Sequence, residues 1–101
     1  MDEPIVWMEG RLDRRPHISQ TESGPQAMLL VNVMTGFGIR QYSVRADGSE
    51  HVGQVGSHHA DKGSALILKG VLADHEDDGC DVVAMTLAFD PSRATTAGSE
   101  A

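Results

Sequence analysis

Aromatic side chains and cysteine are scarce in this sequence. Its 101 residues include one tryptophan, one tyrosine, two phenylalanines and a single cysteine, Cys80. One cysteine excludes a disulfide framework or a four-cysteine metal site within the chain, so a reducing cytoplasm is the expected compartment. No stretch approaches the roughly 20 apolar residues of a membrane helix. The acidic start, Met-Asp-Glu-Pro, lacks the apolar segment of a secretory signal, so we expect neither export nor membrane insertion.

Positive charge is also in short supply. The chain has 8 lysine and arginine residues against 15 aspartate and glutamate residues, for a formal net charge of −7. Such a chain is not held to nucleic acid or to an acidic membrane by bulk charge alone. The charge is uneven, however, because arginines gather between Gly10 and Ala46, whereas acids outnumber cations from Asp47 onward. The pattern indicates either an ordinary solvated surface or one weakly basic face on an acidic body.

Sequence motifs for catalysis are absent. There is no G-x-S-x-G, no complete phosphate-binding loop and no G-x-G-x-x-G, and Lys62-Gly63-Ser64 reverses the order that a phosphate loop needs. We therefore expect a protein without enzymatic activity, catalytic residues or cofactor. A histidine segment offers ligands for zinc or nickel only if the chain folds them together, and a solvated polar segment is the preferred interpretation. The residues concerned are Glu50, His51, His58, His59 and Asp61.

The stretch Lys62–Leu72, KGSALILKGVL, is the clearest predicted strand. It is short, bounded by glycines and rich in branched residues, which favours a strand over a buried helix. Ala65, Ile67 and Lys69 would face one way and Leu66, Leu68 and Gly70 the other. A glycine inside a strand marks a bulge, a bend or a close backbone approach. Because strands must bend to close a small barrel, this stretch suggests one.

Three further strands are predicted before it, and the second and third of them form a hairpin. Ile5–Leu12 alternates, with an expected bulge near Glu9-Gly10. Gln26–Thr35 is apolar on both faces, which predicts burial by a core on one side and by a partner chain or covering element on the other. Gly36–Gly38 is a tight turn, and Ile39–Val44 returns from it as the second strand of a hairpin.

The remaining segments complete an all-β pattern. Ser49–Asp61 is predicted as a short helix or crossing segment in which Ser49 is the N-cap, and Val82–Phe89 as the last strand after an acidic loop. We expect residues 1–90 to form one domain and residues 91–101 a flexible tail. Five strands with a helix or crossing segment between the third and fourth are typical of the OB-fold, a Greek-key barrel. An unrelated five-stranded barrel or a small sandwich remains an alternative.

Two groups of residues resemble a known family. Gly10-Arg-Leu12, Pro16, Ile18, Thr21 and Ser23-Gly24, followed by the apolar strand, are similar to the opening of bacterial single-stranded DNA-binding proteins. KGSALILKGVL resembles the family's later K-G-S/D and G-x-L segment, and primosomal replication protein N is a second choice on the same fold. This chain departs from the family in its shortened Gly36–Gly38 loop, its few aromatic residues and the acidic loop after G-x-L.

The resemblance implies binding of single-stranded DNA in replication, repair or mobile-element biology. Such binding needs cations for phosphates and flat side chains for bases, and the acidic charge predicts weak, salt-sensitive affinity. We expect stacking on Phe37 and Tyr42. The predicted phosphate contacts are Arg14, Arg15, Arg40, Lys62 and Lys69. The predicted interface of a homodimer or homotetramer contains Trp7, Met28 and Leu30. The alternatives are an OB-like subunit that binds a protein partner instead of nucleic acid and, less favoured, a small-ligand or metal-binding domain.

Overall fold

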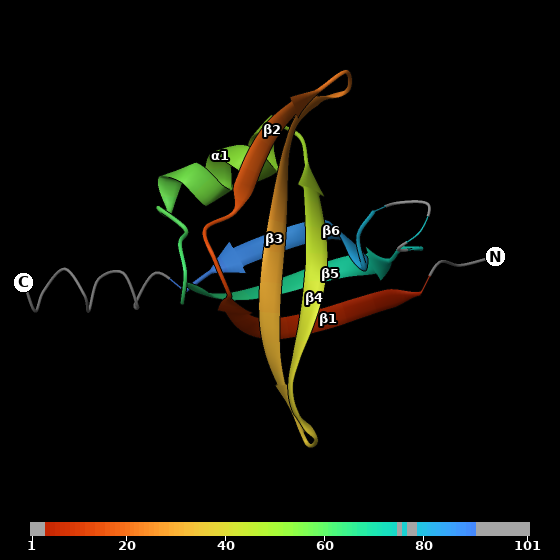
Figure 1. Cartoon of the computed structure of the whole chain (residues 1–101). Coiled ribbons are helices and arrows are strands. Elements are labelled where there is room, and N and C mark those ends of the chain that lie inside the picture. The colour runs from red at the N-terminus through yellow and green to blue at the C-terminus, as the bar shows by residue number, and fades with distance from the viewer. Residues whose placement is uncertain (1–3, 75, 77–78, 91–101) are drawn as a thin grey trace, which may run out of the picture.

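The part of the chain that the structure describes folds into six strands and one helix (Figure 1). The computed structural model describes residues 4–74, 76 and 79–90, so the predicted tail, residues 91–101, and part of the acidic loop lie outside the described residues. No helix in the described part is long and apolar enough to cross a membrane. The elements are β1 (Ile5–Leu12), β2 (His17–Thr21), β3 (Gly24–Thr35), β4 (Gly38–Asp47), α1 (Ser49–Ser57), β5 (Ala65–Leu72) and β6 (Val82–Phe89).

The strands close into a barrel. Their order in the sheet is β1-β5-β6-β4-β3-β2, and an additional pairing joins β1 to β3 at Arg11↔Asn32 and Leu12↔Val31. Parallel pairing of β4 with β6 completes the circuit. Both β1 and β2 pair with β3, so together they take the place of one bent strand, and the predicted five-stranded OB barrel is confirmed. The separate strand β2 was not predicted.

Glycines allow two close backbone approaches within the barrel. A Cβ atom at Gly10 would lie 2.3 Å from the Asn32 carbonyl oxygen, where β1 meets β3. A Cβ atom at Gly70 would lie 2.6 Å from the Val83 carbonyl oxygen, and the β5–β6 register shifts between Lys69 and Gly70. The interpretation of Gly70 is therefore confirmed. The bulge expected near Glu9-Gly10 is wrong, because the β1–β5 register runs unbroken from Ile5 to Arg11.

The core is built from the inward-facing residues of every strand except β2. Alternation in β3 places Ala27, Leu29 and Val31 fully inside, whereas Met28 and Leu30 on the outer face are half-buried. Phe89, the last residue of β6, is also buried in the core. No polar or charged residue is buried within the described part of the chain. Other core members are Met8, Leu12, Val44, Leu66, Leu68, Val82 and Leu87.

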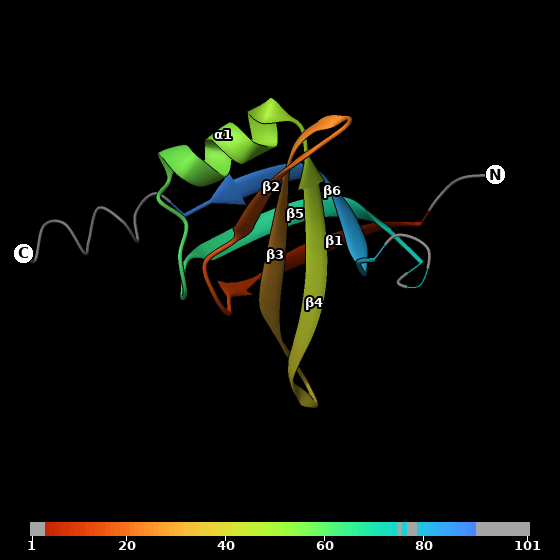
Figure 2. The same ribbon diagram turned by 45° about the horizontal axis from the view of Figure 1, so that its top comes forward.

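Helix α1 covers one end of the barrel (Figures 1 and 2). It packs against β3, β4 and β6 and buries Val55. The Gln54 side chain donates a 2.6 Å hydrogen bond to the Leu87 carbonyl and so ties the helix to β6. The prediction of Ser49 as N-cap is wrong, because Gly48 holds that position with φ 98° and no side chain caps the helix. A positive φ favours glycine over serine at this corner.

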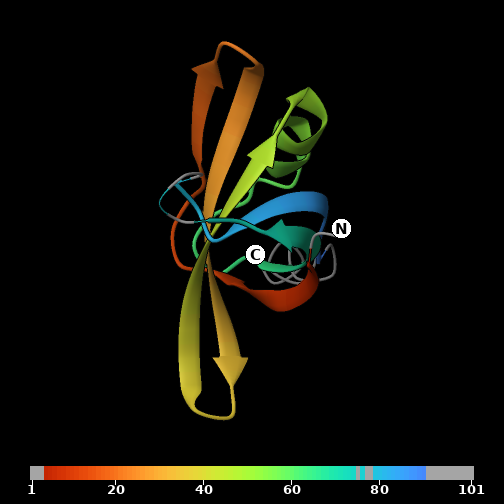
Figure 3. The same ribbon diagram turned by 90° about the vertical axis from the view of Figure 1, so that its right-hand side faces the viewer.

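The tip of the β3–β4 hairpin projects from the barrel. The register of the hairpin runs from Gln26↔Asp47 to Thr35↔Gly38, and the far end extends away from α1 (Figure 3). We call the part from Val33 to Arg40 the arm. Met34 and Ile39 pair on one face of it and are both exposed. The arm therefore presents apolar side chains to the outside rather than to the core.

Candidate nucleic-acid interface

Cations from two distant segments gather where β1 ends. The loop before β5 returns to this point, because Gly63 N–H donates to the Leu12 carbonyl at 2.8 Å and Leu12 N–H donates to the Ser64 carbonyl at 2.9 Å. Arg11 Nη1 reaches the Gly63 carbonyl at 3.2 Å. The cluster consists of Arg11, Arg14, Arg15 and Lys62, and we call it the basic end. All four residues are exposed to solvent.

One carboxylate lies inside the basic end. Arg15 Nη2 donates to Asp61 Oδ2 at 2.9 Å, and the Lys62 backbone N–H donates to Asp61 Oδ1 at 2.8 Å. The hydrogen bond from Arg15, followed by that from Lys62, lowers the pKa of Asp61, and the same bond from Arg15 raises the pKa of Arg15. Asp61 is therefore ionised at neutral pH and offsets part of the local positive charge.

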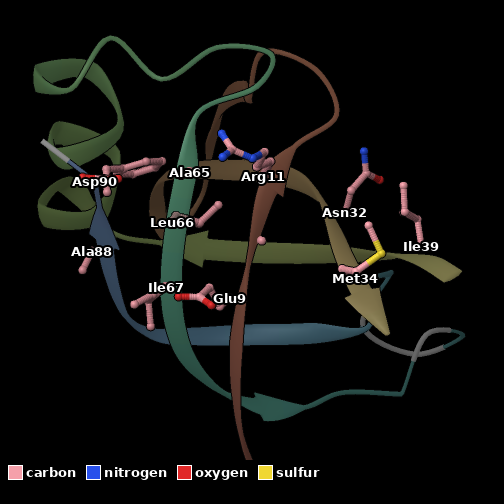
Figure 4. A pocket seen from close by; sticks show the side chains of 12 residues that line it. Glu9, Arg11, Asn32, Met34, Ile39, Ala65, Leu66, Ile67, Ala88 and Asp90 are labelled. Atoms are coloured by element: carbon pink, nitrogen blue, oxygen red, sulfur yellow. The ribbon is translucent and has the colours of Figure 1, made fainter. Parts of the chain in front are cut away.

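A groove of about 720 Å³ begins beside the basic end (Figure 4). Arg11, Ile67 and Ala88 line it from β1, β5 and β6, and Met34 and Ile39 line it from the arm. It forms because β1 pairs with β3 only at Arg11 and Leu12, after which the arm diverges from the sheet. Most of the lining is apolar, but Glu9, Asn32 and Asp90 add polar groups. A flat, partly apolar group such as a nucleobase fits this chemistry.

Asn32 lies where the groove meets the barrel. Its Nδ2 donates to Asp13 Oδ1 at 3.0 Å. Its Oδ1 is buried and has no hydrogen-bond partner among the described residues. An unsatisfied buried acceptor costs about 1–3 kcal/mol.

The tip of the arm presents Phe37 fully to solvent. Thr35 orders this turn, because its hydroxyl donates to the Gly38 carbonyl at 2.7 Å and accepts from the Phe37 N–H at 3.1 Å. Gly38 adopts φ 114°, a conformation that side-chain-bearing residues rarely take. Phe37 is therefore an aromatic face without a partner within the described chain.

Arg40 and Tyr42 lie on the other face of the arm strand. They pair with Val33 and Val31, whose side chains point towards the core. Tyr42 is partly buried and packs against the core, whereas Arg40 is exposed. The structure thus brings Arg14, Arg15 and Lys62 together but sets Tyr42 apart from Phe37.

Trp7 and Lys69 share the outer face of the sheet. They pair across β1 and β5, and Lys69 Nζ lies 5.5 Å from the Trp7 ring centroid. Trp7 is 70% exposed, and Ile5 and Ile67 are exposed on the same face. The other predicted interface residues, Met28 and Leu30, lie on the outer face of β3; the Leu30 carbonyl accepts a hydrogen bond from Asp13 N–H at the opposite end of β1 from Ile5.

The histidine segment has structural contacts. His51 Nδ1 lies 2.9 Å from the Asp47 carbonyl oxygen and Nε2 lies 3.2 Å from that of Met85. His58 stacks on Phe89 with ring centroids 5.6 Å apart. No group of three or more histidine, cysteine or acidic side chains in the described ranges is arranged to hold a metal ion.

Several residues of the groove were not predicted from the sequence to contact DNA. Arg11, Asn32, Met34, Ile39 and Ile67 line it but were not among the predicted contacts. For Arg11 a signal was present, because it lies close to Arg14 at the end of the first predicted strand. For the others there was none, since only closure of the barrel opposes the arm to β5.

Solved structures share this fold. The small single-stranded DNA-binding protein of Streptomyces coelicolor matches with a TM-score of 0.73 and 16% identity, over 91% of this chain and 98% of its own. The mitochondrial single-stranded DNA-binding protein of S. cerevisiae matches with a TM-score of 0.72 and 11% identity, over 89% and 97%. A deletion mutant of the Thermus aquaticus single-stranded DNA-binding protein matches at 22% identity and a TM-score of 0.70, over 85% of this chain and 40% of its own.

Comparison by sequence finds no relative of this chain. No protein-family profile matches it, and no curated protein matches it. Similarity to the three structures therefore establishes the fold of this chain, as its sequence resemblance to that family implied.

Proposed function

We propose that this protein is a non-enzymatic OB-fold module that binds single-stranded DNA. The observation that carries the proposal is the position of Arg11, which belongs both to the basic end and to the lining of the apolar groove. A single strand of DNA bound at Arg11 would place its phosphates against the cations of the basic end and its bases in the groove. The proteins with this fold that are described above are single-stranded DNA-binding proteins by name, which supports the same function.

In this proposal the phosphates contact the basic end. Arg14 and Lys62 form no ion pair within the described residues and supply full charges, while Arg15 shares its charge with Asp61. Arg40 extends the positive path along the arm. Lys69 contributes from β5 on the same sheet face as Arg11, where its ammonium group also lies over Trp7. Because the whole chain carries −7, affinity is modest and falls steeply with salt.

The bases contact apolar and aromatic surface. Met34, Ile39 and Ile67 form the walls of the groove, and Phe37 offers a stacking face at the tip of the arm. Stacking on an aromatic side chain is worth about 1–3 kcal/mol per base. Tyr42 contributes through its exposed edge, since the remainder of its ring packs against the core.

We also propose that copies of this chain associate through the outer sheet face around Trp7. Ile5 and Trp7 expose apolar surface together on β1. An exposed apolar surface of this kind on a small protein is typical of an interaction site. Met28 and Leu30, half-buried on β3 at the other end of β1, would form a second contact in a larger homo-oligomer.

Fluorescence anisotropy of labelled oligo-dT over a salt series tests DNA binding. Replacing both Arg14 and Lys62 by glutamine should lower the slope of log affinity against log salt by roughly 1.4, which is about 0.7 for each lost phosphate contact. Arg45→Gln is the matched control, because Arg45 pairs with Asp47 at 3.2 Å outside the basic end. If the unmodified protein does not bind oligo-dT at low salt, the proposal is wrong.

A further inference from the structure

Asp61 holds the guanidinium group of the basic end that would otherwise receive a phosphate. Arg15 is 77% exposed at its side chain and Asp61 is 50% exposed, and their atoms Nη2 and Oδ2 are 2.9 Å apart. The partners are separated by 46 residues in the sequence. The contact therefore exists only because the barrel brings the end of β1 to the loop before β5.

The loop fixes the carboxylate in place. The Ser64 N–H donates to the Asp61 carbonyl at 3.0 Å, and the Asp61 N–H donates to the Ser64 hydroxyl at 3.0 Å. The second carboxylate oxygen, Oδ1, accepts from the Lys62 N–H at 2.8 Å. Asp61 is thus oriented towards Arg15 by its own turn, unlike a surface ion pair between two unrestrained side chains.

Carboxylates and phosphates compete for the same donors. Both present oxygen pairs that match the planar fork of a guanidinium group. One oxygen of Asp61 accepts from Arg15 and the other from the Lys62 backbone N–H, so the carboxylate occupies Arg15 through a single contact. The lowered pKa of Asp61 and the raised pKa of Arg15 agree with a well-formed pair.

We propose that Asp61 is an internal competitor for phosphate at Arg15 and limits the affinity of this surface for single-stranded DNA. This inference rests on the proposed function. A strand must displace the Asp61 carboxylate before a phosphate can contact Nη2 of Arg15. Arg11, Arg14 and Lys62 hold the strand first, so Arg15 is engaged only by a ligand with several phosphates.

Asp61→Asn tests the competition, with Asp47→Asn as its matched control. Both substitutions remove one negative charge and one arginine–carboxylate contact, but Asp47 contacts Arg45 outside the basic end. With oligo-dT at low salt, Asp61→Asn should raise affinity about two- to fivefold, the range expected for the loss of one exposed ion pair. It should also steepen the salt slope by about 0.7, whereas Asp47→Asn should do neither.

Arg15→Gln in two backgrounds provides the second measurement. It should cost more affinity in the Asp61→Asn background than in the native one, because only removal of the carboxylate leaves Arg15 open to phosphate. Thermal unfolding of each variant checks that the fold is intact.

The outcomes separate the two proposals. Tighter binding by Asp61→Asn but not by Asp47→Asn, with the larger cost of Arg15→Gln in the Asp61→Asn background, supports the inference. Equal effects of Asp61→Asn and Asp47→Asn, or equal costs of Arg15→Gln in both backgrounds, overturn the inference while the DNA-binding function stands. Absence of binding by every variant overturns the function and the inference with it.

Discussion

Lys69 lies across β1 and β5 from Trp7, with its ammonium nitrogen 5.5 Å from the centroid of the indole ring. The contact joins a residue predicted to bind phosphate to one predicted to lie between subunits. One sheet face therefore carries both proposed roles. An ammonium group over an indole ring is a favourable contact, and it leaves most of Trp7 exposed.

The tryptophan emission should report assembly through this face. Trp7 is the only tryptophan, so its fluorescence should shift to shorter wavelength as protein concentration rises and copies bury it. Trp7→Glu should give a monomer by sedimentation at concentrations where the unmodified protein associates. Ile18→Glu, which alters an exposed apolar residue on β2, is the control and should still associate. A monomer at all concentrations without substitution would contradict the proposed interface.

Gly10→Ala should destabilise the barrel by about 3 kcal/mol, at the upper end of the range for overpacking. The new methyl group would lie 2.3 Å from the Asn32 carbonyl oxygen, which is backbone and cannot move aside. Gly36→Ala at the arm has nothing within 4 Å and should stay within about 0.5 kcal/mol of the unmodified protein. Urea unfolding measures both. Equal stability of the two variants would show that β1 and β3 can separate without cost.

Phe37→Ala should weaken DNA binding by about 1–3 kcal/mol and leave thermal stability unchanged. The ring is fully exposed at the tip of the arm, so its removal leaves no cavity. Tyr42→Ala should instead lower the free energy of unfolding by about 1–3 kcal/mol, because this ring packs against the core. Anisotropy titration and urea unfolding of both variants separate the two roles. Unchanged oligo-dT affinity of Phe37→Ala would exclude stacking at the tip.

The carboxyl group of Asp61 should titrate below its ordinary range in an NMR pH titration. Arg15→Gln should raise its pKa back towards that range, because the hydrogen bond from Arg15 is the largest cause of the shift. Since the folded-state pKa is lowered, the pair stabilises the fold above the ordinary aspartate pKa, and this contribution is lost as pH falls through the folded value. Both side chains are exposed, so solvent screening keeps the contribution small. An unchanged titration in Arg15→Gln would show that the ion pair does not form in solution.

The strands of the fold follow from local patterns. Ile5–Leu12 and Val82–Phe89 agree with the observed strands residue for residue, because alternation in an apolar segment is a local signal. Strand β2 escaped this reasoning, since four of its five residues are exposed and it has no buried face to mark it. The helix was expected, but its N-cap was assigned to Ser49. The positive φ of Gly48, the observed N-cap, arises at the corner after β4 and has no local signal in the sequence.

The candidate site was harder to predict than the fold. Alternation placed Arg40, Tyr42 and Val44 on one face of a strand without telling which face is inside, because Ile39 on the other face is also apolar. Burial of Val44 settles it, so Tyr42 faces inward with Val31. Likewise, Gln26–Thr35 was expected to be buried on both faces, yet Met34 lies exposed on the projecting arm.

The sequence by itself determined the class of fold, the positions of the long strands and the role of Gly70 in the bend of β5. These depend on periodicity and on the conformational properties of single residues. Tertiary structure alone decided the groove, the close approach at Gly10 and the pairing of Arg15 with Asp61. The physical reason is that barrel closure joins segments far apart in the chain, and neither contact between side chains nor competition between charges is encoded in any local pattern.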